Sequence, residues 1–391
     1  MDQGQNKKII IHNKSSKPDN IVEAEVRTDE ECEEIERELP GFLRGFFIYL
    51  RGNVLPMTRL AYLHDIRFFF QYLVKETSLT RAEIPKDVTA SEMDRVKAED
   101  VNMFLDYCRR YRVETEKNIV VYENHNKTLA RKKSSLSVMF KQLYRDGVIA
   151  ENITDGFDPI RVQKASEREI KALQDDEVMV MLDAVSTGTG LTAHEKAYWE
   201  KTKKRDKAIL ILFLTYGLRL SELQQLNISS FNFSRGEFTI YRKRGKESLM
   251  PLNQSVTMVV EDYIHNERKD DSELLPENQD ALFLSLQGRR MTQRQIRELV
   301  KKYTSIAMKT SRSAGYSPHK LRATAATSLI GRGNSIYDVA ALLDHEQVTT
   351  TQLYARQRIG AKRDMVKELE WETERLETEK YAHEAENKKT E

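Results

Sequence analysis

The sequence predicts a mainly α-helical protein of two domains with a small β component. Its 391 residues are enough for two or three domains. Apolar and aromatic side chains recur at spacings near 3.6 residues between Leu39 and Tyr144, and again after Leu173, which predicts helices in both parts. Residues 152–170 combine Asn, Gly and Pro with many charges and have the composition of a linker. Alternating apolar residues appear clearly only around Phe238, where they predict a β-hairpin.

The overall composition gives little information about a partner. The net charge is only +2, from 63 basic and 61 acidic side chains, so bulk charge does not mark a polyanion as the ligand. Cys32 and Cys108 are too few for a disulfide framework, which favours a reducing compartment. The start at Met1 has no apolar signal segment, and the apolar run 208–214 is far shorter than the ~20 residues that span a bilayer. We therefore expect a cytoplasmic protein that does not contact a membrane.

The first domain is expected to be helical and to follow a polar arm. Residues 1–35 are charged and show little periodicity, so they predict a flexible or lightly structured segment. Residues 36–151 predict two aromatic-rich helices followed by helices at Ala98–Tyr111 and Thr128–Tyr144. Because the aromatic side chains keep a helical spacing, we interpret them as core residues and not as a platform that stacks on bases.

A basic cluster on the last of these helices is the candidate for contact with phosphates. Its members expected to touch DNA are Lys127, Arg131, Lys132, Lys133 and Lys141. Dense local positive charge of this kind suits a nucleic-acid backbone. A solvated helix face would carry the same residues.

The second domain, residues 171–360, opens with a helix after Leu173 and a polar insertion at 186–202. The all-apolar run 208–214 predicts a helix that is buried on every side and that Gly217 ends. In the helix that follows, leucines face the core while Arg219 and Glu222, three residues apart, share another face.

The predicted hairpin and the segments after it carry further polar candidates. Strands are expected at Phe238–Arg242 and Ser248–Leu252, joined by a turn at Arg244 and Gly245 that Lys243 and Lys246 flank. Ser317 followed by Pro318 predicts a helix start with a hydroxyl cap, which places His319 and Arg322 one turn apart on the same face. Ser335 with Asp338 resembles a capping box for a helix that leads to His345, and Tyr354 follows.

Together these residue types can transfer a DNA strand. Arginines bind one phosphate through paired hydrogen bonds, lysine and histidine move protons, and tyrosine can attack phosphorus. The strings 215–222, 318–322, 343–345 and 350–354 resemble the sequence boxes of the tyrosine recombinases, also called the phage integrase family. The resemblance extends over roughly residues 36 to 360. It implies a helical, SAM-like core-binding domain and a mixed α/β catalytic domain that close on DNA as a C-shaped clamp.

The resemblance also assigns roles to residues. The implied catalytic set is Arg219, Lys243, His319, Arg322, His345 and Tyr354, with Glu222 orienting the first arginine. Matching residues 246–252 to the usual Lys-Glu-x-Leu-x-Pro-Leu ending identifies Lys243 as the acid that protonates the leaving 5′ oxygen. Because Arg242 and Arg244 stand where glycines are common, Lys246 remains the alternative, and all three basic neighbours of Lys243 are expected to contact phosphates.

The implied activity is site-specific DNA recombination through a 3′-phosphotyrosine intermediate, either for a mobile element or for resolving chromosome dimers. No metal and no cofactor are expected, because the covalent bond keeps the phosphodiester energy. The expected partner is a double-stranded recombination site, bound by a homotetramer that is a monomer or dimer when free, and accessory DNA-bending proteins are compatible with this scheme. Residues 361–391 are expected to form a charged helical tail; in relatives a segment of this kind packs on a neighbouring protomer.

Two other functions fit parts of the pattern. A type IB topoisomerase shares the Arg, Lys, His and Tyr chemistry, but the helical first domain and the order from hairpin to tyrosine favour the recombinase. A noncatalytic DNA-binding regulator could keep the fold, yet it would have no need of the complete catalytic series.

Overall fold

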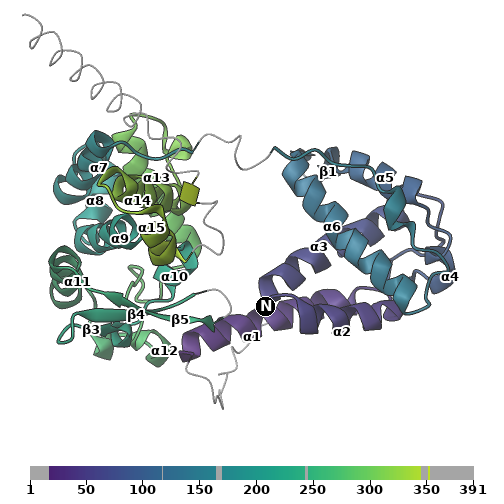
Figure 1. The fold of residues 1–391 in the computed structure, drawn as a ribbon, viewed down its shortest axis with the longest axis horizontal. Coiled ribbons are helices and arrows are strands. Elements are labelled where there is room, and N and C mark those ends of the chain that lie inside the picture. Colours follow the sequence, from purple (N-terminus) through teal and green to yellow (C-terminus); the bar gives the residue numbers. More distant parts are fainter. Residues whose placement is uncertain (1–16, 117, 164–169, 243–244, 345–350, 353–391) are drawn as a thin grey trace, which may run out of the picture. The chain divides into compact units, whose positions relative to one another are not determined.

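The computed structural model describes residues 17–116, 118–163, 170–242, 245–344 and 351–352. The chain divides into two compact units, residues 1–164 and 165–391, which follow one another in the colours of Figure 1. Each unit has its own hydrophobic core and consists mainly of helices, with few strands. In the described ranges, no helix combines the length and the apolar character needed to cross a bilayer.

The first unit is a bundle of helices with one hairpin. Its helices are α1 (Asp19–Arg37), α2 (Arg44–Asn53), α3 (Pro56–Glu76), α4 (Ala90–Met93), α5 (Ala98–Tyr107) and α6 (Asn126–Arg145). Strands β1 (Arg110–Glu114) and β2 (Ile119–Glu123) pair in antiparallel fashion between α5 and α6. Helix α3 packs against α1 and α6, which makes it the centre of the bundle.

Aromatic side chains fill the core of this unit. Phe46, Phe69, Phe104 and Phe140 have no exposed surface. The rings of Phe69 and Phe104 meet edge to face with centroids 5.1 Å apart, the arrangement that aromatic quadrupoles favour. The prediction that these aromatics belong to the core is confirmed.

The structure corrects three expectations in this unit. The segment expected to be a polar arm forms helix α1 from Asp19 onward, because a narrow stripe that includes Cys32 and Ile35 is buried against the bundle. The helix expected to run to Tyr111 ends at Tyr107, and Tyr111 lies in β1 opposite Tyr122. The β-branched run 119–121 in β2, between the two expected helices, is typical of strands and is the sequence signal for this hairpin.

The third correction concerns the expected linker at 152–170. Its first part belongs to the first unit, since Phe157 is only 6% exposed and packs in the aromatic core. Asn102 of α5 holds it in place, donating from Nδ2 to the Gly156 carbonyl (3.1 Å) and accepting at Oδ1 from the Asp158 N–H (2.9 Å).

The second unit surrounds one buried helix. Its helices are α7 (Asp175–Thr187), α8 (Ala193–Trp199), α9 (Lys203–Tyr216), α10 (Leu220–Gln224), α11 (Gln254–Asn266), α12 (Pro276–Gln279), α13 (Gln293–Ala307), α14 (Pro318–Gly331) and α15 (Ile336–Leu343). Helices α7, α11 and α14 all pack against α9. Ile209, Leu212 and Phe213 of α9 have no exposed surface, so the prediction of a helix buried on its faces is confirmed.

A small antiparallel sheet lies beside these helices in the order β3 (Phe231–Asn232), β4 (Glu237–Tyr241) and β5 (Glu247–Pro251). Phe238 of β4 lies opposite Met250 of β5, and both face the core. The predicted hairpin is therefore confirmed in its strands, while Lys243 and Arg244 at its tip lie outside the described residues.

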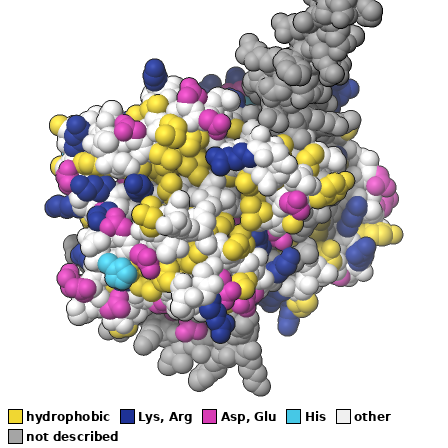
Figure 2. Space-filling model, turned by 60° about the vertical axis from the view of Figure 1, so that its left-hand side comes forward, with side chains coloured by type: hydrophobic (Ala, Val, Ile, Leu, Met, Phe, Trp, Pro, Cys, Tyr) yellow, Lys and Arg dark blue, Asp and Glu magenta, His cyan; other side chains and the backbone are white. Residues whose placement is uncertain are grey.

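One face of the structure carries mixed charge. On the face shown in Figure 2, Lys and Arg side chains alternate with Asp and Glu side chains, and apolar side chains lie between them. This mixture agrees with the net charge of +2. On this face, recognition of a charged ligand would therefore depend on the local arrangement of side chains and not on a broad field of one sign.

Candidate active site

Arg219 occupies the junction between the buried helix α9 and the short helix α10. Helix α9 ends at Gly217, whose φ of 57° is the left-handed conformation that a glycine adopts without strain. Arg219 is the residue that precedes α10, and its Nη1 donates to Glu222 Oε1 at 2.6 Å. Glu222 Oε2 also accepts the backbone N–H of Arg219 at 2.7 Å. The expected contact between the two residues is present, and the 3% exposed carboxylate holds the guanidinium in one orientation.

Arg322 lies on α14 and is almost completely buried, at 3% exposure. Its Nη1 donates to the carbonyl of Gly217 at 2.7 Å, and its Nη2 donates to the carbonyl of Leu343. These two bonds connect the end of α9 to the end of α15. The arginine therefore both holds the two segments together and brings its charge to the place where they meet.

Arg242, directly after β4, reaches the same place. It was expected to contact DNA from the surface of the hairpin, but only 6% of it is exposed and its Nη2 donates to the Leu342 carbonyl at 2.8 Å. Burial lowers the pKa of Arg242, yet an arginine stays protonated at neutral pH. Arg242 is therefore a buried member of this cluster, and its contact with DNA stays a prediction.

The end of α15 is the common partner of the three arginines. The carbonyl of Leu342 accepts from Arg242, that of Leu343 from Arg322, and that of Asp344 from Arg219 at 2.9 Å. The last carbonyls of a helix have no partner within the helix and carry its negative dipole end, so they attract cations. Three guanidinium groups from distant parts of the sequence consequently gather at one helix end.

Lys246, directly before β5, also contacts the end of α15. Its Nζ lies 3.1 Å from Asp344 Oδ1, and Arg219 Nη1 lies 3.6 Å from Asp344 Oδ2. Burial alone would raise the pKa of Asp344, but the hydrogen bond from Lys246 and the nearby arginines hold it below its usual value. The carboxylate is therefore ionised at neutral pH.

The remaining predicted catalytic residues divide into one that is described and three that are not. His319 is exposed and lies in the first turn of α14, one turn before Arg322, as the spacing predicts. Helix α14 begins at Pro318, but the Ser317 side chain makes no cap hydrogen bond, and at α15 Ser335 caps Tyr337 without a capping box. Lys243, His345 and Tyr354 lie outside the described residues, as does the tail 361–391.

The basic cluster of α6 does not act as one surface. Lys132 is buried and its Nζ lies 3.0 Å from Asp65 Oδ1, while Arg131 pairs with the other oxygen of the same carboxylate. Lys133 donates to the carbonyls at the end of the first unit. Lys132 therefore compensates a buried carboxylate on α3, and its contact with DNA stays a prediction. Lys127 and Lys141 are exposed.

The predicted insertion at 186–202 is part of the fold of the second unit. It forms α8, whose Trp199 is 7% exposed and donates from Nε1 to the Val185 carbonyl at 2.8 Å. Glu195 of α8 accepts from Arg312 at both carboxylate oxygens, at 2.9 Å each, and this pairing lowers the pKa of Glu195 to about 2. The segment is thus fixed at both of its faces, which the polar composition did not indicate.

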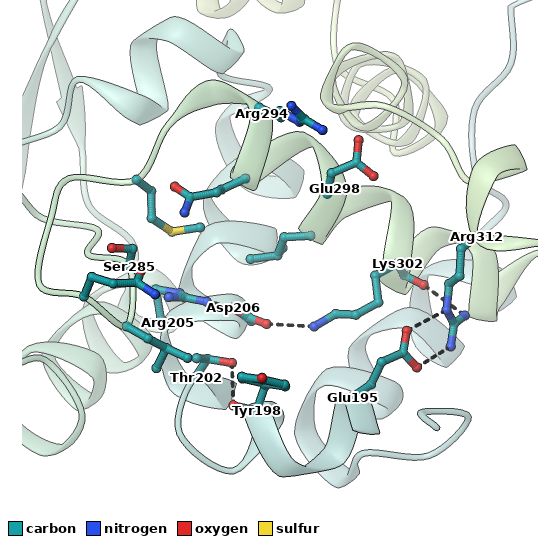
Figure 3. Close-up of a pocket in the computed structure, with 15 residues that line it drawn as sticks. Glu195, Tyr198, Thr202, Arg205, Asp206, Ser285, Arg294, Glu298, Lys302 and Arg312 are labelled. Carbon is teal, nitrogen blue, oxygen red and sulfur yellow. Dashed lines mark hydrogen bonds and ion pairs between the residues drawn. The ribbon is translucent and has the colours of Figure 1, made fainter. Parts of the chain in front are cut away.

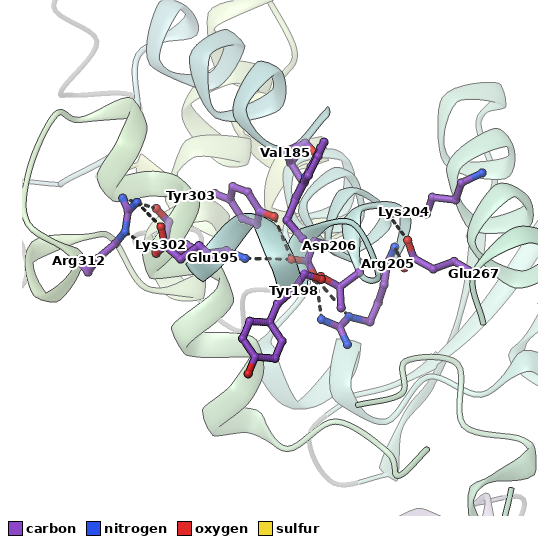
Figure 4. Close-up of polar contacts among 12 residues, drawn as sticks. Val185, Glu195, Tyr198, Lys204, Arg205, Asp206, Glu267, Lys302, Tyr303 and Arg312 are labelled. Atoms are coloured by element: carbon purple, nitrogen blue, oxygen red, sulfur yellow. Dashed lines mark hydrogen bonds and ion pairs between the residues drawn. The ribbon is translucent and has the colours of Figure 1, made fainter. Parts of the chain in front are cut away.

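A pocket of about 560 Å³ opens beside α8, and Figure 3 shows that α8, α9 and α13 line it. At its base, Asp206 accepts from Arg205, Lys302 and Tyr303 (Figure 4). These polar groups pair with one another, and Arg219, His319 and Arg322, the predicted catalytic residues that the structure describes, do not line the pocket. We therefore interpret it as a structural junction.

The comparisons with known proteins identify the family of the chain. Residues 171–359 match the model of the phage integrase family. The chain is 32% identical to the tyrosine recombinase XerC of Natranaerobius thermophilus over 312 residues, which cover 74% of this chain and 93% of that protein. It is 30% identical over 306 residues to the XerC of Caldanaerobacter subterraneus, covering 76% and 77% of the two chains.

Solved structures show the same fold at low sequence identity. The integrase of the transposon Tn1549, in complex with a circular intermediate DNA, aligns with a TM-score of 0.55 and 19% identity over 87% of this chain and 99% of that chain. The recombinase XerH, bound to a palindromic difH substrate after cleavage, aligns with a TM-score of 0.54 and 17% identity over 91% and 90% of the two chains.

On this two-unit, mainly helical fold, three arginines gather at the end of α15, and the relatives are enzymes of DNA recombination. The chain belongs to the phage integrase family and is a tyrosine recombinase, which cleaves and rejoins DNA at specific sites through a tyrosine-linked intermediate. The predictions of family, fold class and reaction are confirmed, and neither the topoisomerase nor the noncatalytic regulator is favoured by these relatives.

Proposed function

We propose that the scissile phosphate of a double-stranded recombination site binds at the end of α15, in contact with Arg219 and Arg322. The observation that carries this proposal is the convergence of Arg219, Arg242 and Arg322 on three successive carbonyls. Guanidinium groups suit the nonbridging oxygens of a phosphate because they donate paired, charge-assisted hydrogen bonds. Charge on these oxygens grows in the pentavalent transition state, so donors held in place beforehand lower the barrier.

In the proposed reaction, the phenolic oxygen of Tyr354 attacks phosphorus and forms a 3′-phosphotyrosine bond. The bond from phosphorus to the 5′ oxygen breaks, and Lys243 supplies the proton that this oxygen takes up. His319 accepts the proton of the tyrosine, and His345 donates a hydrogen bond to a nonbridging oxygen. A 5′ hydroxyl of the partner duplex then reverses the step, so no nucleotide is hydrolysed.

The free tyrosine has a pKa near 10, so attack at neutral pH needs both a base and a cationic surrounding. The arginines at the end of α15 supply the positive charge. His319 is suitable as the base because it lies one helical turn from Arg322, at the exposed start of α14.

We further propose that four copies of the chain act together on two synapsed duplexes. Exchange of both strands in two duplexes cleaves four strands, and each cleavage uses one tyrosine. The free chain is then a monomer or dimer. Integration or excision of a mobile element and the resolution of chromosome dimers use this same chemistry, and recombination assays with the DNA that flanks the gene distinguish these roles.

A nicked suicide substrate tests the nucleophile. The wild-type chain should trap a covalent 3′ adduct, whereas Tyr354→Phe should bind the same DNA and trap none. Tyr337→Phe is the matched control, because Tyr337 is 70% exposed on α15 and its hydroxyl should not matter. An adduct that persists in Tyr354→Phe would show that the nucleophile lies elsewhere. Equal loss in Tyr337→Phe would contradict the assignment, because the loss would then not be specific to Tyr354.

The leaving group separates Lys243 from Lys246. Lys243→Ala should slow cleavage by roughly the 10²–10⁴-fold that a lost proton donor costs. A 5′-bridging phosphorothiolate should restore the rate, because sulfur leaves as a thiolate without a proton. Lys246→Ala should weaken DNA binding modestly without such a rescue. If the thiolate substrate rescued Lys246→Ala alone, the two roles would be exchanged.

A further inference from the structure

Asp344 places a negative charge within the cationic cluster proposed to bind DNA. Its carboxylate lies between Lys246 Nζ, 3.1 Å from Oδ1, and Arg219 Nη1, 3.6 Å from Oδ2. The side chain is 24% exposed, so solvent and a ligand can still reach it. Arg219 therefore has two acidic neighbours, the deeply buried Glu222 and the more accessible Asp344.

The backbone at Asp344 is unusual for a residue with a side chain. Its φ of 51° and ψ of 53° are left-handed, and it forms the cap that ends α15. Glycine adopts this conformation most readily, and Asp and Asn tolerate it better than other residues. The carboxylate is fixed close to the arginines because the carbonyl of the same residue accepts from Arg219 at 2.9 Å.

A carboxylate and a phosphodiester compete for the same donors. Both present anionic oxygens that accept from guanidinium and ammonium groups. Two negative charges a few ångströms apart repel each other strongly in a partly buried site. Lys246 and Arg219 can therefore bind Asp344 or a phosphate, but binding of both at once is unfavourable.

We propose that Asp344 is an anionic stopper, a side chain that occupies the phosphate site of the DNA-free enzyme and that the DNA phosphate must displace. This inference rests on the proposed function, which assigns the phosphate to Arg219. In the free protein the stopper pairs with Arg219 and Lys246 and prevents adventitious anions from binding. When DNA binds, Lys246 and Arg219 exchange the carboxylate for the phosphate, so the affinity for DNA is lower than the arginines alone would give.

The test removes the charge and retains the backbone. In Asp344→Asn the side chain keeps its shape and tolerates the left-handed conformation, and Asp344→Gly is the second variant because glycine adopts that conformation freely. Asp176→Asn is the matched control, since Asp176 is an exposed acid in the first turn of α7 and its replacement causes the same change in net charge.

Two measurements on the full chain report on the stopper. The first is the rise in melting temperature caused by inorganic phosphate, which involves neither DNA nor catalysis. The second is the dissociation constant for a DNA half-site at fixed salt concentration. Both Asp344 variants should show a larger phosphate-induced rise than Asp176→Asn, and a dissociation constant roughly tenfold lower, which corresponds to about 1.4 kcal/mol.

The result that would overturn the inference is half-site binding by both Asp344 variants that is no tighter than that of Asp176→Asn. Weaker binding would mean that Asp344 holds Lys246 in position for DNA. Trapping of the covalent adduct by the wild-type chain separates the proposed function from the role of Asp344. If no adduct forms, the proposed function fails and the phosphate measurement still tests Asp344; if an adduct forms without tighter binding by the variants, only the stopper is refuted.

Discussion

Replacement of Asp206 by Asn should destabilise the second unit far more than replacement of an exposed acid. Asp206 is 1% exposed and accepts from Arg205 at Nε (3.2 Å) and Nη2 (2.8 Å), from Lys302 Nζ (3.2 Å) and from the Tyr303 hydroxyl (3.0 Å). An amide keeps one acceptor oxygen but points two N–H groups at donors. The substitution therefore removes the charge that compensates Arg205 and Lys302 and adds donors where acceptors are needed.

The expected loss follows from the burial of this cluster. Removing one partner of a buried ion pair typically costs about 3–5 kcal/mol, because the other charge remains buried without compensation. We expect about 3 kcal/mol, the lower end, since the side chain of Lys302 remains 21% exposed and water can take over part of the role of Asp206. For a unit of this size, this corresponds to a fall in melting temperature on the order of 6–12 °C.

Asp262→Asn is the control. Asp262 pairs with Lys204 at 2.6 Å, but both side chains are substantially exposed, and pairs of this kind contribute about 0–1 kcal/mol. Trp199 is 7% exposed in the core of the second unit, so its fluorescence during urea unfolding follows that unit. A loss in Asp206→Asn that is no larger than the loss in Asp262→Asn would refute the reasoning that burial makes the Asp206 cluster essential.

Three further predictions concern the backbone, pH and metals. Gly217→Ala should lower the free energy of unfolding by about 2–4 kcal/mol, because the new Cβ would lie 2.5 Å from Leu343 Cδ2 and the left-handed backbone is strained for alanine. Gly236→Ala is the control: its φ is also left-handed, but nothing lies near the new Cβ, so urea unfolding should show the backbone strain alone. The hydrogen bonds from Arg312 lower the pKa of Glu195 to about 2. The stabilisation that this pairing gives is therefore complete above pH ~4.5 and is lost as the pH falls towards 2. In Glu195→Gln the free energy of unfolding should depend less on pH in that window. Strand cleavage should proceed in excess EDTA, and a complete loss restored only by magnesium would contradict a mechanism based on tyrosine and arginine.

Local patterns in the sequence were sufficient wherever a feature depends on neighbouring residues. The apolar run 208–214 predicts α9, and the alternation around Phe238 predicts the hairpin, because helical and extended periodicities are properties of short segments. Each catalytic motif is also a short string of neighbouring residues, so the motifs and their order identify the family without the structure. The polar segment that forms α8 was not predicted, since its buried apolar residues, Leu191 and Trp199, find their places only against α7 and the core.

The sequence by itself predicted the buried helix α9, the β4–β5 hairpin and the family, but only the tertiary structure decided which charges face inward. Lys132 appears as one cation among several until Asp65, 67 residues earlier, takes it as a buried partner. Arg242 appears as part of an exposed basic tip until the end of α15, 100 residues later, requires a donor for its carbonyl. The burial of a charge depends on a partner brought close by folding, and the distance along the chain between these partners leaves no local pattern to recognise.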